Sequence, residues 1–465
     1  MRATCPHRTC LMGLLSVLLA GGPGALAADL GGACCADLEE RIAELEATAV
    51  RKGNRKVSLE VYGQVNEAVL YWDDGGEDNT YTVTNDNARS RVGFRGKAKI
   101  TGEWEAGYRL EIGVRGANSK RFDQDQAGGA ENAGLDLRDS NWYLRNTSLG
   151  TVYVGRGTTA TNSITELDLA QTSQFAKFSD VEDTGLGLFL RSAKSGGLSA
   201  LTWRRLLGDG GDQPGEGERA LDLVRFETAE WNGFTASASW GADDVWDVAL
   251  RYSGTLAGFK LAAGLGYGEV TDIDQTQTVC TAANPDAATD TTCSNLGGSF
   301  SAQHEASGLF VSFGAGIKTD DLLAQTARFA GTGADDEQVF WAINAGIEKK
   351  FNSFGKTTVF GQYYDYDGGA NQRRTIDGVD GGAADALNPF AAGDDSTVWS
   401  TGLQMYGGGL AQSFDSAGLL LYVYYRHYDA EITARQLVAG SALGAVADLP
   451  LEDLDVVVAG GLIKF

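Results

Sequence analysis

The chain has 465 residues and is rich in glycine, with 63 glycines against 6 prolines. Its 62 acidic and 38 basic side chains give a formal net charge of −24 at pH 7, which argues against binding to nucleic-acid phosphates. After the first 27 residues no stretch approaches the roughly 20 consecutive apolar residues of a transmembrane helix, so a helical membrane protein is excluded.

Residues 1–27 have the pattern of a secretory signal peptide. A basic start precedes the apolar run Leu11–Ala20, which is too short to span a bilayer, and the small-x-small sequence 25–27 follows it. We therefore expect cleavage after Ala27 and export of a mature chain that begins with Ala28 and Asp29.

Residues 28–54 are predicted to form a periplasmic leader that contains a short amphipathic helix. Apolar residues recur with a 4-3-4 spacing at Leu38, Ile42, Leu45 and Ala49, with charged residues between them. About two heptads are marginal when isolated. The segment is therefore either a frayed amphipathic leader or a small coiled coil that is supported by an oligomeric barrel.

From residue 55 to residue 465 the hydrophobic pattern changes to a period of two, which is typical of β-strands. The clearest hairpin covers residues 89–115, where apolar residues such as Val92 and Phe94 alternate with charged ones. A slip of one residue would turn every charge toward the apolar side, so the register is strongly specified. The polar face of this hairpin carries seven basic residues, namely Arg89, Arg91, Arg95, Lys97, Lys99, Arg109 and Arg115.

The connections between the predicted strands alternate between short glycine turns and long polar loops. Several strands run ten residues or more, near the roughly 9–11 residues that a tilted strand needs to cross a bilayer. Short turns at one rim and long loops at the other are typical of outer-membrane barrels. The fold class is therefore all-β, a transmembrane antiparallel β-barrel of sixteen or eighteen strands, and the last strand ends at Phe465.

Two cysteines, Cys280 and Cys293, flank a polar stretch in one predicted long loop. In an oxidising compartment this pair either closes the loop as a disulfide or remains as two free thiols. The local sequence does not distinguish these two states.

The sequence also resembles the general diffusion porins of Gram-negative bacteria, particularly those of the alphaproteobacterial branch. The residues that carry the resemblance span nearly the whole mature chain. They are the segments 51–59 and 61–64, Gly150–Gly157 with the following 158–168, 345–351 with 354–358, and the terminal Phe465.

This resemblance implies a homotrimer of sixteen-stranded barrels in the outer membrane, with a constriction loop inside each lumen. The loop at about 157–183 stands where that constriction loop belongs, although it lacks the Pro-Glu-Phe-Gly-Gly turn of enteric porins. The resemblance also implies that Phe465 is part of the signal read by the barrel-assembly machinery. An Ala28-Asp29 start fits the attachment to peptidoglycan seen in related families.

The predicted function is a water-filled channel for passive diffusion of small hydrophilic solutes and ions. We hypothesise that the basic face of residues 89–115 confronts acidic residues of the constriction loop across a narrow eyelet, where the field filters solutes. In the alternative, the same charges pair locally and only fix the loop to the wall. The acidic residues in question are Glu166, Asp168, Asp180, Glu182 and Asp183.

Three other readings remain weaker. An enzyme is not predicted, because the mature chain has only two histidines, His304 and His427, and neither lies in a nucleophile motif. No cofactor and no metal are predicted. The predicted partners of the barrel surface are outer-membrane lipid and lipopolysaccharide. A substrate-specific channel would need a row of aromatic side chains along the channel wall, and Tyr363, Tyr364 and Tyr366 are candidates for it. A protein that tethers the outer membrane to peptidoglycan would use residues 28–54 for that contact.

Overall fold

A computed structural model describes residues 56–465 except 126–133, 208–212, 218–220, 242–244, 272–291, 322, 324–328, 330, 377–384, 391–393 and 439–441. The predicted signal peptide, leader helix and Cys280 lie outside the described residues. No helix in the described part is long and apolar enough to cross a membrane.

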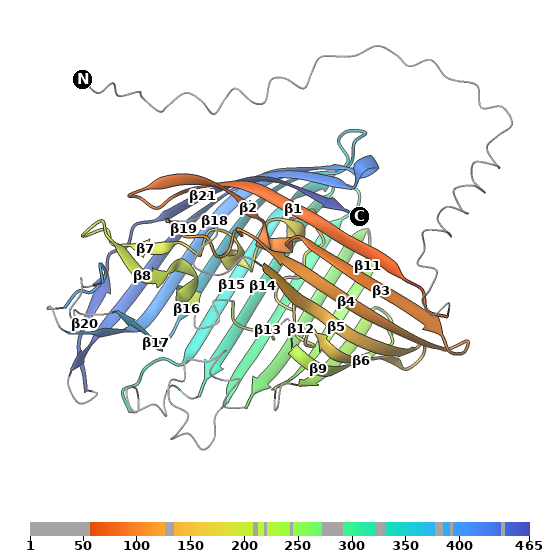
Figure 1. The fold of residues 1–465 in the computed structure, drawn as a ribbon, viewed down its shortest axis with the longest axis horizontal. Helices are drawn as coiled ribbons and strands as arrows, with labels where there is room; N and C mark the ends of the chain where they lie inside the picture. Colours follow the sequence, from red (N-terminus) through yellow and green to blue (C-terminus); the bar gives the residue numbers. More distant parts are fainter. Residues whose placement is uncertain are drawn as a thin grey trace, which may run out of the picture. The chain divides into compact units, whose positions relative to one another are not determined.

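The described residues form one closed antiparallel barrel (Figure 1). Its sheet holds 19 strands, of which 16 make the wall and three short ones extend it. The wall closes because the last strand pairs with the first, for example at Leu70 and Val458. The wall strands are β1 (Glu60–Asp73), β3 (Arg91–Lys99), β4 (Trp104–Arg115), β5 (Gly134–Asn146), β6 (Gly150–Gly157), β9 (Leu221–Thr228), β10 (Phe234–Gly241), β11 (Val245–Leu256), β12 (Phe259–Val270), β13 (Cys293–His304), β14 (Leu309–Asp320), β15 (Glu337–Lys349), β16 (Thr357–Gly368), β18 (Ser396–Phe414), β19 (Leu419–Val438) and β21 (Leu454–Lys464).

The remaining elements lie in the connections. The three extending strands are β2 (Asp78–Thr84), β17 (Asn371–Ile376) and β20 (Ala442–Leu449), which pair with β1, β18 and β19. A separate two-stranded sheet joins β7 (Phe189–Arg191) and β8 (Leu198–Thr202). The short 3-10 helices are η1 (Asp86–Ala88), η2 (Gln171–Gln174), η3 (Val181–Asp183), η4 (Trp203–Leu207) and η7 (Asp415–Ala417).

The β7–β8 hairpin decides between sixteen and eighteen wall strands. Its glycine turn at 194–197 and its two-residue period are those of a wall hairpin, but it pairs with no wall strand. A hydrophobic period of two indicates that a segment is extended, but it does not indicate which strand the segment pairs with. The barrel has sixteen wall strands, as the resemblance implied.

The two faces of the wall alternate residue by residue. On β15 the outward Val339, Trp341 and Ile343 are 41%, 40% and 37% exposed, whereas the inward Phe340 and Ala342 are 1% and 0% exposed. An exposed apolar band on the outside is what a barrel presents to lipid. The inner apolar residues require a partner inside the barrel.

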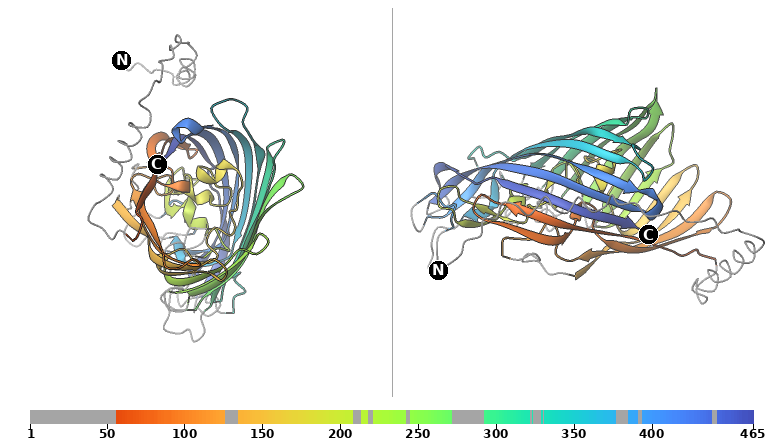
Figure 2. Two further views of the ribbon diagram at one scale, coloured as in Figure 1. Left: turned by 90° about the vertical axis from the view of Figure 1, so that its right-hand side faces the viewer. Right: turned by 90° about the horizontal axis from the view of Figure 1, so that it is seen from above.

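That partner is the long connection between β6 and β9. It contains η2, η3, the β7–β8 hairpin and η4, and it lies within the ring of strands when the barrel is viewed end-on (Figure 2). Its buried apolar side chains form one cluster with inward residues of β1, β15, β16, β18, β19 and β21. We call residues 158–207 the inner belt.

Candidate pore constriction

The inner belt is fixed to the wall from its first residues. Asp247 on β11 accepts hydrogen bonds from the backbone N–H groups of Ala160 (3.0 Å) and Thr161 (2.7 Å). Arg251, on the same strand, donates to the carbonyl of Ala160 at 2.7 Å. Further along, a β-carbon added to Gly314 on β14 would lie 2.2 Å from the carbonyl oxygen of Thr165. Glycine at this position therefore allows the belt backbone to touch the wall.

The second part of the belt packs against β19 through aromatic rings. Phe175 is fully buried and stacks on Tyr422, with ring centroids 4.8 Å apart and planes 12° apart. The hydroxyl of Tyr428 donates to the carbonyl of Thr184 at 2.8 Å, and that of Tyr424 lies 3.0 Å from the Thr184 hydroxyl. This half of the barrel interior is therefore a packed core.

The opposite half of the lumen contains a cavity of about 490 Å³ between the belt and wall strands that include β1, β3, β5, β11 and β12. We call this cavity the eyelet. Basic and acidic side chains both line it, and the acidic ones come mainly from the belt and the segment after it. The lining cations include Arg89, Arg91, Lys120, Arg121, Arg138 and Lys177, and the lining carboxylates include Asp86, Glu166, Asp180, Glu182, Asp183 and Glu216.

One buried carboxylate organises the basic wall of the eyelet. Glu111 on β4 is 0% exposed and accepts hydrogen bonds from Arg138 Nε (2.8 Å) and Arg109 Nη2 (2.9 Å). Arg91 Nε lies 3.8 Å from the same carboxylate, and the hydroxyl of Tyr62 donates to it at 3.0 Å. The sequence prediction did not include Glu111, although its place in the alternating pattern of β4 puts it on the polar face.

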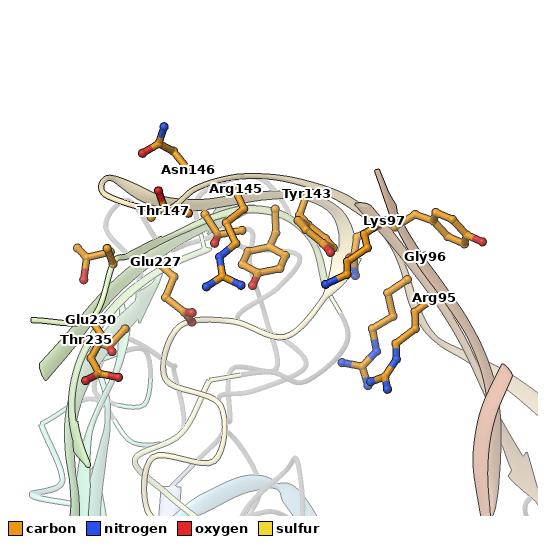
Figure 3. A pocket seen from close by; sticks show the side chains of 18 of the residues that line it. Arg95, Gly96, Lys97, Tyr143, Arg145, Asn146, Thr147, Glu227, Glu230 and Thr235 are labelled. Atoms are coloured by element: carbon orange, nitrogen blue, oxygen red, sulfur yellow. The ribbon is translucent and has the colours of Figure 1, made fainter. Parts of the chain in front are cut away.

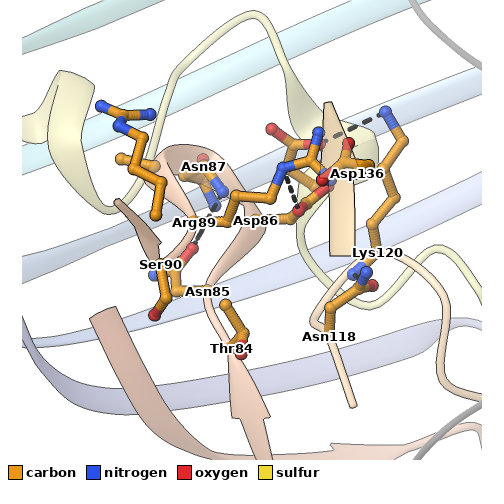
Figure 4. A network of polar contacts seen from close by, with 12 residues as sticks. Thr84, Asn85, Asp86, Asn87, Arg89, Ser90, Asn118, Lys120 and Asp136 are labelled. Atoms are coloured by element: carbon orange, nitrogen blue, oxygen red, sulfur yellow. Dashed lines mark hydrogen bonds and ion pairs between the residues drawn. The ribbon is translucent and has the colours of Figure 1, made fainter. Parts of the chain in front are cut away.

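Arg89 and Lys120 each make two further ion pairs, which connect the loops at the rim of the eyelet (Figure 4). Arg89 lies 3.6 Å from Asp86 and 3.3 Å from Asp136, which anchors the segment after η1 to β5. Lys120 lies 3.3 Å from both Glu182 and Asp183 of the belt. These contacts hold the acidic part of the belt against its basic neighbours.

The acidic side of the eyelet is a coupled group around Lys177. Its ammonium lies 2.7 Å from Glu166 and also pairs with Asp180. Burial opposes ionisation of Asp180, but the charge of Lys177 outweighs it and lowers the pKa of Asp180 to about 2. Burial raises the pKa of Asp183 to about 6 and that of Glu216 to about 7, and Asp180 adds to both shifts.

The structure divides the predicted basic residues between two places. Arg89 and Arg91 line the eyelet with the acidic residues of the belt, whereas Arg95, Lys97 and Arg109 line a second cavity nearer the short turns. These three pair with carboxylates of the wall itself: Arg95 with Glu60 (2.9 Å), Lys97 with Glu105 (3.6 Å) and Arg109 with Asp139 (3.3 Å). Lys99 is exposed at the end of β3, and the side chain of Arg115 lies outside the described part.

The predicted acidic residues also separate. Glu166, Asp180, Glu182 and Asp183 line the eyelet, but Asp168 lies against the wall, where Ser312 (3.0 Å) and Asn344 (3.1 Å) donate to it. Asp168 therefore holds the belt in place.

Three other sequence candidates have definite positions. Tyr364 and Tyr366 are buried beneath the belt, and Tyr363 lies on the outside beside Trp341, so these three do not form a slide in the lumen. Cys293 is disulfide-bonded, and its partner lies outside the described residues. No cluster of three or more metal-ligating side chains occurs in the described part.

Comparisons with known proteins agree with this architecture. A family model described as Gram-negative porin matches residues 15–442. The anion-selective porin from Comamonas acidovorans has 18% identity and a TM-score of 0.51, covering 88% of this chain and 100% of its own. OmpT, an outer membrane protein of Vibrio cholerae, has 11% identity and a TM-score of 0.48, with 89% and 99% covered. OmpF of Salmonella typhi in complex with daunomycin has 13% identity and a TM-score of 0.48, with 88% and 98% covered. None of the curated proteins compared with the chain matches it.

Proposed function

The chain belongs to the family of Gram-negative porins, and we propose that its eyelet filters solutes by a transverse electric field. Its function is passive diffusion of small hydrophilic solutes through a β-barrel in the outer membrane. In this proposal Arg91 and Arg138 form the positive side of the field, and Asp180, Asp183 and Glu216 form the negative side.

The observation that supports the filter is a cavity lined by charges of both signs on different elements of the fold. The arginines on β3 and β5 contact Glu111 of β4, and Glu216 accepts hydrogen bonds from the belt residue Thr165. Charges fixed in this way order water across the passage. An apolar solute must displace that water without replacing its interactions, so the eyelet favours polar solutes.

Reconstitution tests the channel directly. In planar bilayers, the purified protein is expected to add discrete steps of ion current that grow with KCl concentration. In a second assay, liposomes that contain the protein should swell in sugar solutions at rates that fall with sugar size, while protein-free liposomes should not swell. A protein that inserts into the bilayer and passes neither ions nor sugars contradicts the function.

The pH dependence of selectivity tests the eyelet itself. Between pH 8 and pH 5 the carboxylates of Glu216 and Asp183 should take up protons, because burial and Asp180 raise their pKa values to about 7 and about 6. Lys177 and the arginines keep their charge in this range. The eyelet therefore becomes more positive, and the reversal potential in a KCl gradient should move toward anion selectivity as the pH falls.

The variant Glu216→Gln should flatten this shift between pH 8 and pH 6, because it removes a carboxylate whose pKa is about 7. Glutamine keeps the size of the side chain that now accepts hydrogen bonds from Ser163 (2.9 Å) and Thr165 (2.8 Å). As a control, Glu305→Gln changes an exposed carboxylate in a short turn. The selectivity of this variant channel should change with pH as it does in the parent. A Glu216→Gln channel with an unchanged pH profile would remove Glu216 from the filter.

We further propose the assembly that the sequence resemblance implies. The barrels associate as a homotrimer among outer-membrane lipid and lipopolysaccharide, and the chain derives from the alphaproteobacterial branch of the family. Phe465 is recognised by the barrel-assembly machinery; in support, its side chain is 63% exposed and its backbone pairs with Gly63 at the seam (3.0 and 3.1 Å). The barrel carries no enzymatic activity in this proposal.

The parts of the chain outside the described residues complete the proposal. Residues 1–27 are removed as a signal peptide, and residues 28–54 form the leader that contacts peptidoglycan in addition to the channel function. Cys280 is the partner of Cys293 in the disulfide, because it is the nearest other cysteine in the sequence.

A further inference from the structure

A second cavity lies in the barrel on the side of the short turns. It has a volume of about 850 Å³ and is lined by inward residues of β3, β5, β6 and β9, with Asn146, Thr147 and Glu230 at its rim (Figure 3). We call it the vestibule. Short turns face the periplasm in barrels of this type, so the vestibule is the periplasmic mouth of the channel. Its volume is in the range of pockets that hold small molecules.

The vestibule wall carries an aromatic surface. Tyr143 and Tyr153 are directly opposite each other on β5 and β6, with ring centroids 5.8 Å apart. Tyr143 lies across Gly107 of β4, where an added β-carbon would be 2.2 Å from the ring. The guanidinium of Arg225 lies over the Tyr153 ring at 4.5 Å. Glycine on one side and arginine on the other keep the two rings in place on the wall.

Two charged side chains beside these rings have no hydrogen-bond or ion-pair partner among the described residues. Arg145 on β5 and Glu227 on β9 both point into the vestibule (Figure 3), and neither makes a hydrogen bond or ion pair with any residue of the described part. The cross-strand neighbour of Arg145 is Glu105, which pairs with Lys97 at 3.6 Å. Thr151 of β6 stands between the two residues in register, so their backbones are about 10 Å apart.

We propose that the vestibule binds zwitterionic amino acids with aromatic side chains, an inference that rests on the proposed channel function. The solute carboxylate pairs with Arg145, its ammonium group pairs with Glu227, and its ring packs on Tyr143 and Tyr153. An unpaired cation and an unpaired anion two strands apart match the two charges of one amino acid. Because both charges are exposed to water, the binding is weak, and a transported solute must be able to leave.

Block of the channel by solutes tests this site. In planar bilayers with symmetric KCl, L-phenylalanine should lower the single-channel current at a lower concentration than glycine, 3-phenylpropionate or phenethylamine, which each lack one of the three groups. In Arg145→Gln and in Glu227→Gln the half-blocking concentration of phenylalanine should rise about tenfold, as loss of a charged contact implies. The matched control is Lys260→Gln, an exposed cation on β12 at the same end of the barrel and outside the vestibule, which should block like the parent.

The current in KCl alone separates the two proposals. If Arg145→Gln conducts KCl like the parent and phenylalanine blocks both equally, the site is wrong and the channel function stands. If 3-phenylpropionate blocks the parent at the same concentration as phenylalanine, the site does not recognise a zwitterion. If the parent protein passes no KCl current, the proposed function fails together with the site.

Discussion

Replacing Glu111 with alanine is expected to cost the barrel on the order of 3–5 kcal/mol of stability, as loss of one partner from a buried ion pair does. The side chain is 0% exposed and contacts Arg91, Arg109 and Arg138. Its removal leaves these three guanidinium groups close together with their mutual repulsion less compensated. Urea unfolding of the reconstituted barrel, followed by its shift in gel mobility, measures the loss.

The same substitution should change the selectivity of the channel. The basic wall of the eyelet gains one net positive charge, so the reversal potential in a KCl gradient should move toward anions. Glu103→Ala is the matched control, since it removes an exposed carboxylate from the short turn that precedes β4. If both variants unfold at the same urea concentration as the parent, Glu111 does not organise the basic wall.

The wall of the barrel could be predicted from the sequence because strand alternation is a local property. The charged residues of β3 and β4 stand two apart and share a face whatever the rest of the chain does. Arg89, Arg91, Arg95, Lys97 and Arg109 accordingly line cavities inside the barrel.

The division of the lumen could not be predicted in the same way. Phe340, Met405 and Val456 are apolar residues on the inner face, and a strand that is apolar on both faces shows only that both are covered. What covers the inner face is the belt, which is distant in sequence from β15, β18 and β21. The β7–β8 hairpin has the sequence pattern of a wall hairpin, because the alternation of its residues does not indicate which strands it pairs with.

The pairing of the charges was likewise beyond sequence patterns. Register places Glu111 opposite Asp139 on β5, and a shift between Glu111 and Ile112 brings Arg138 onto the same carboxylate. One irregularity in the ladder therefore determines which ions meet. Arg95, Lys97 and Arg109 pair with carboxylates within the wall, whereas Arg89 and Arg91 line the eyelet together with acidic residues of the belt.

Replacing Phe175 with alanine is expected to loosen the inner belt from β19. The ring is fully buried against Tyr422, Phe360 (5.7 Å) and Tyr424 (6.1 Å), and such a truncation costs about 3–5 kcal/mol of packing. The barrel wall keeps its own hydrogen bonds, so the cost falls on the attachment of the belt. Glu166, Asp180 and Asp183 belong to the belt, and their positions across the eyelet then fluctuate.

Single-channel recording should reveal this as open-channel current noise well above that of the parent, together with a weaker pH dependence of selectivity. The control Phe351→Ala removes a ring that is 60% exposed at a short turn, and its open-channel current noise should equal that of the parent. A quiet Phe175→Ala channel with the parent's pH profile would show that the contacts at Asp247, Arg251 and Ser299 hold the belt without the aromatic core. The filter depends on fixed charges, so noise and loss of selectivity should appear together.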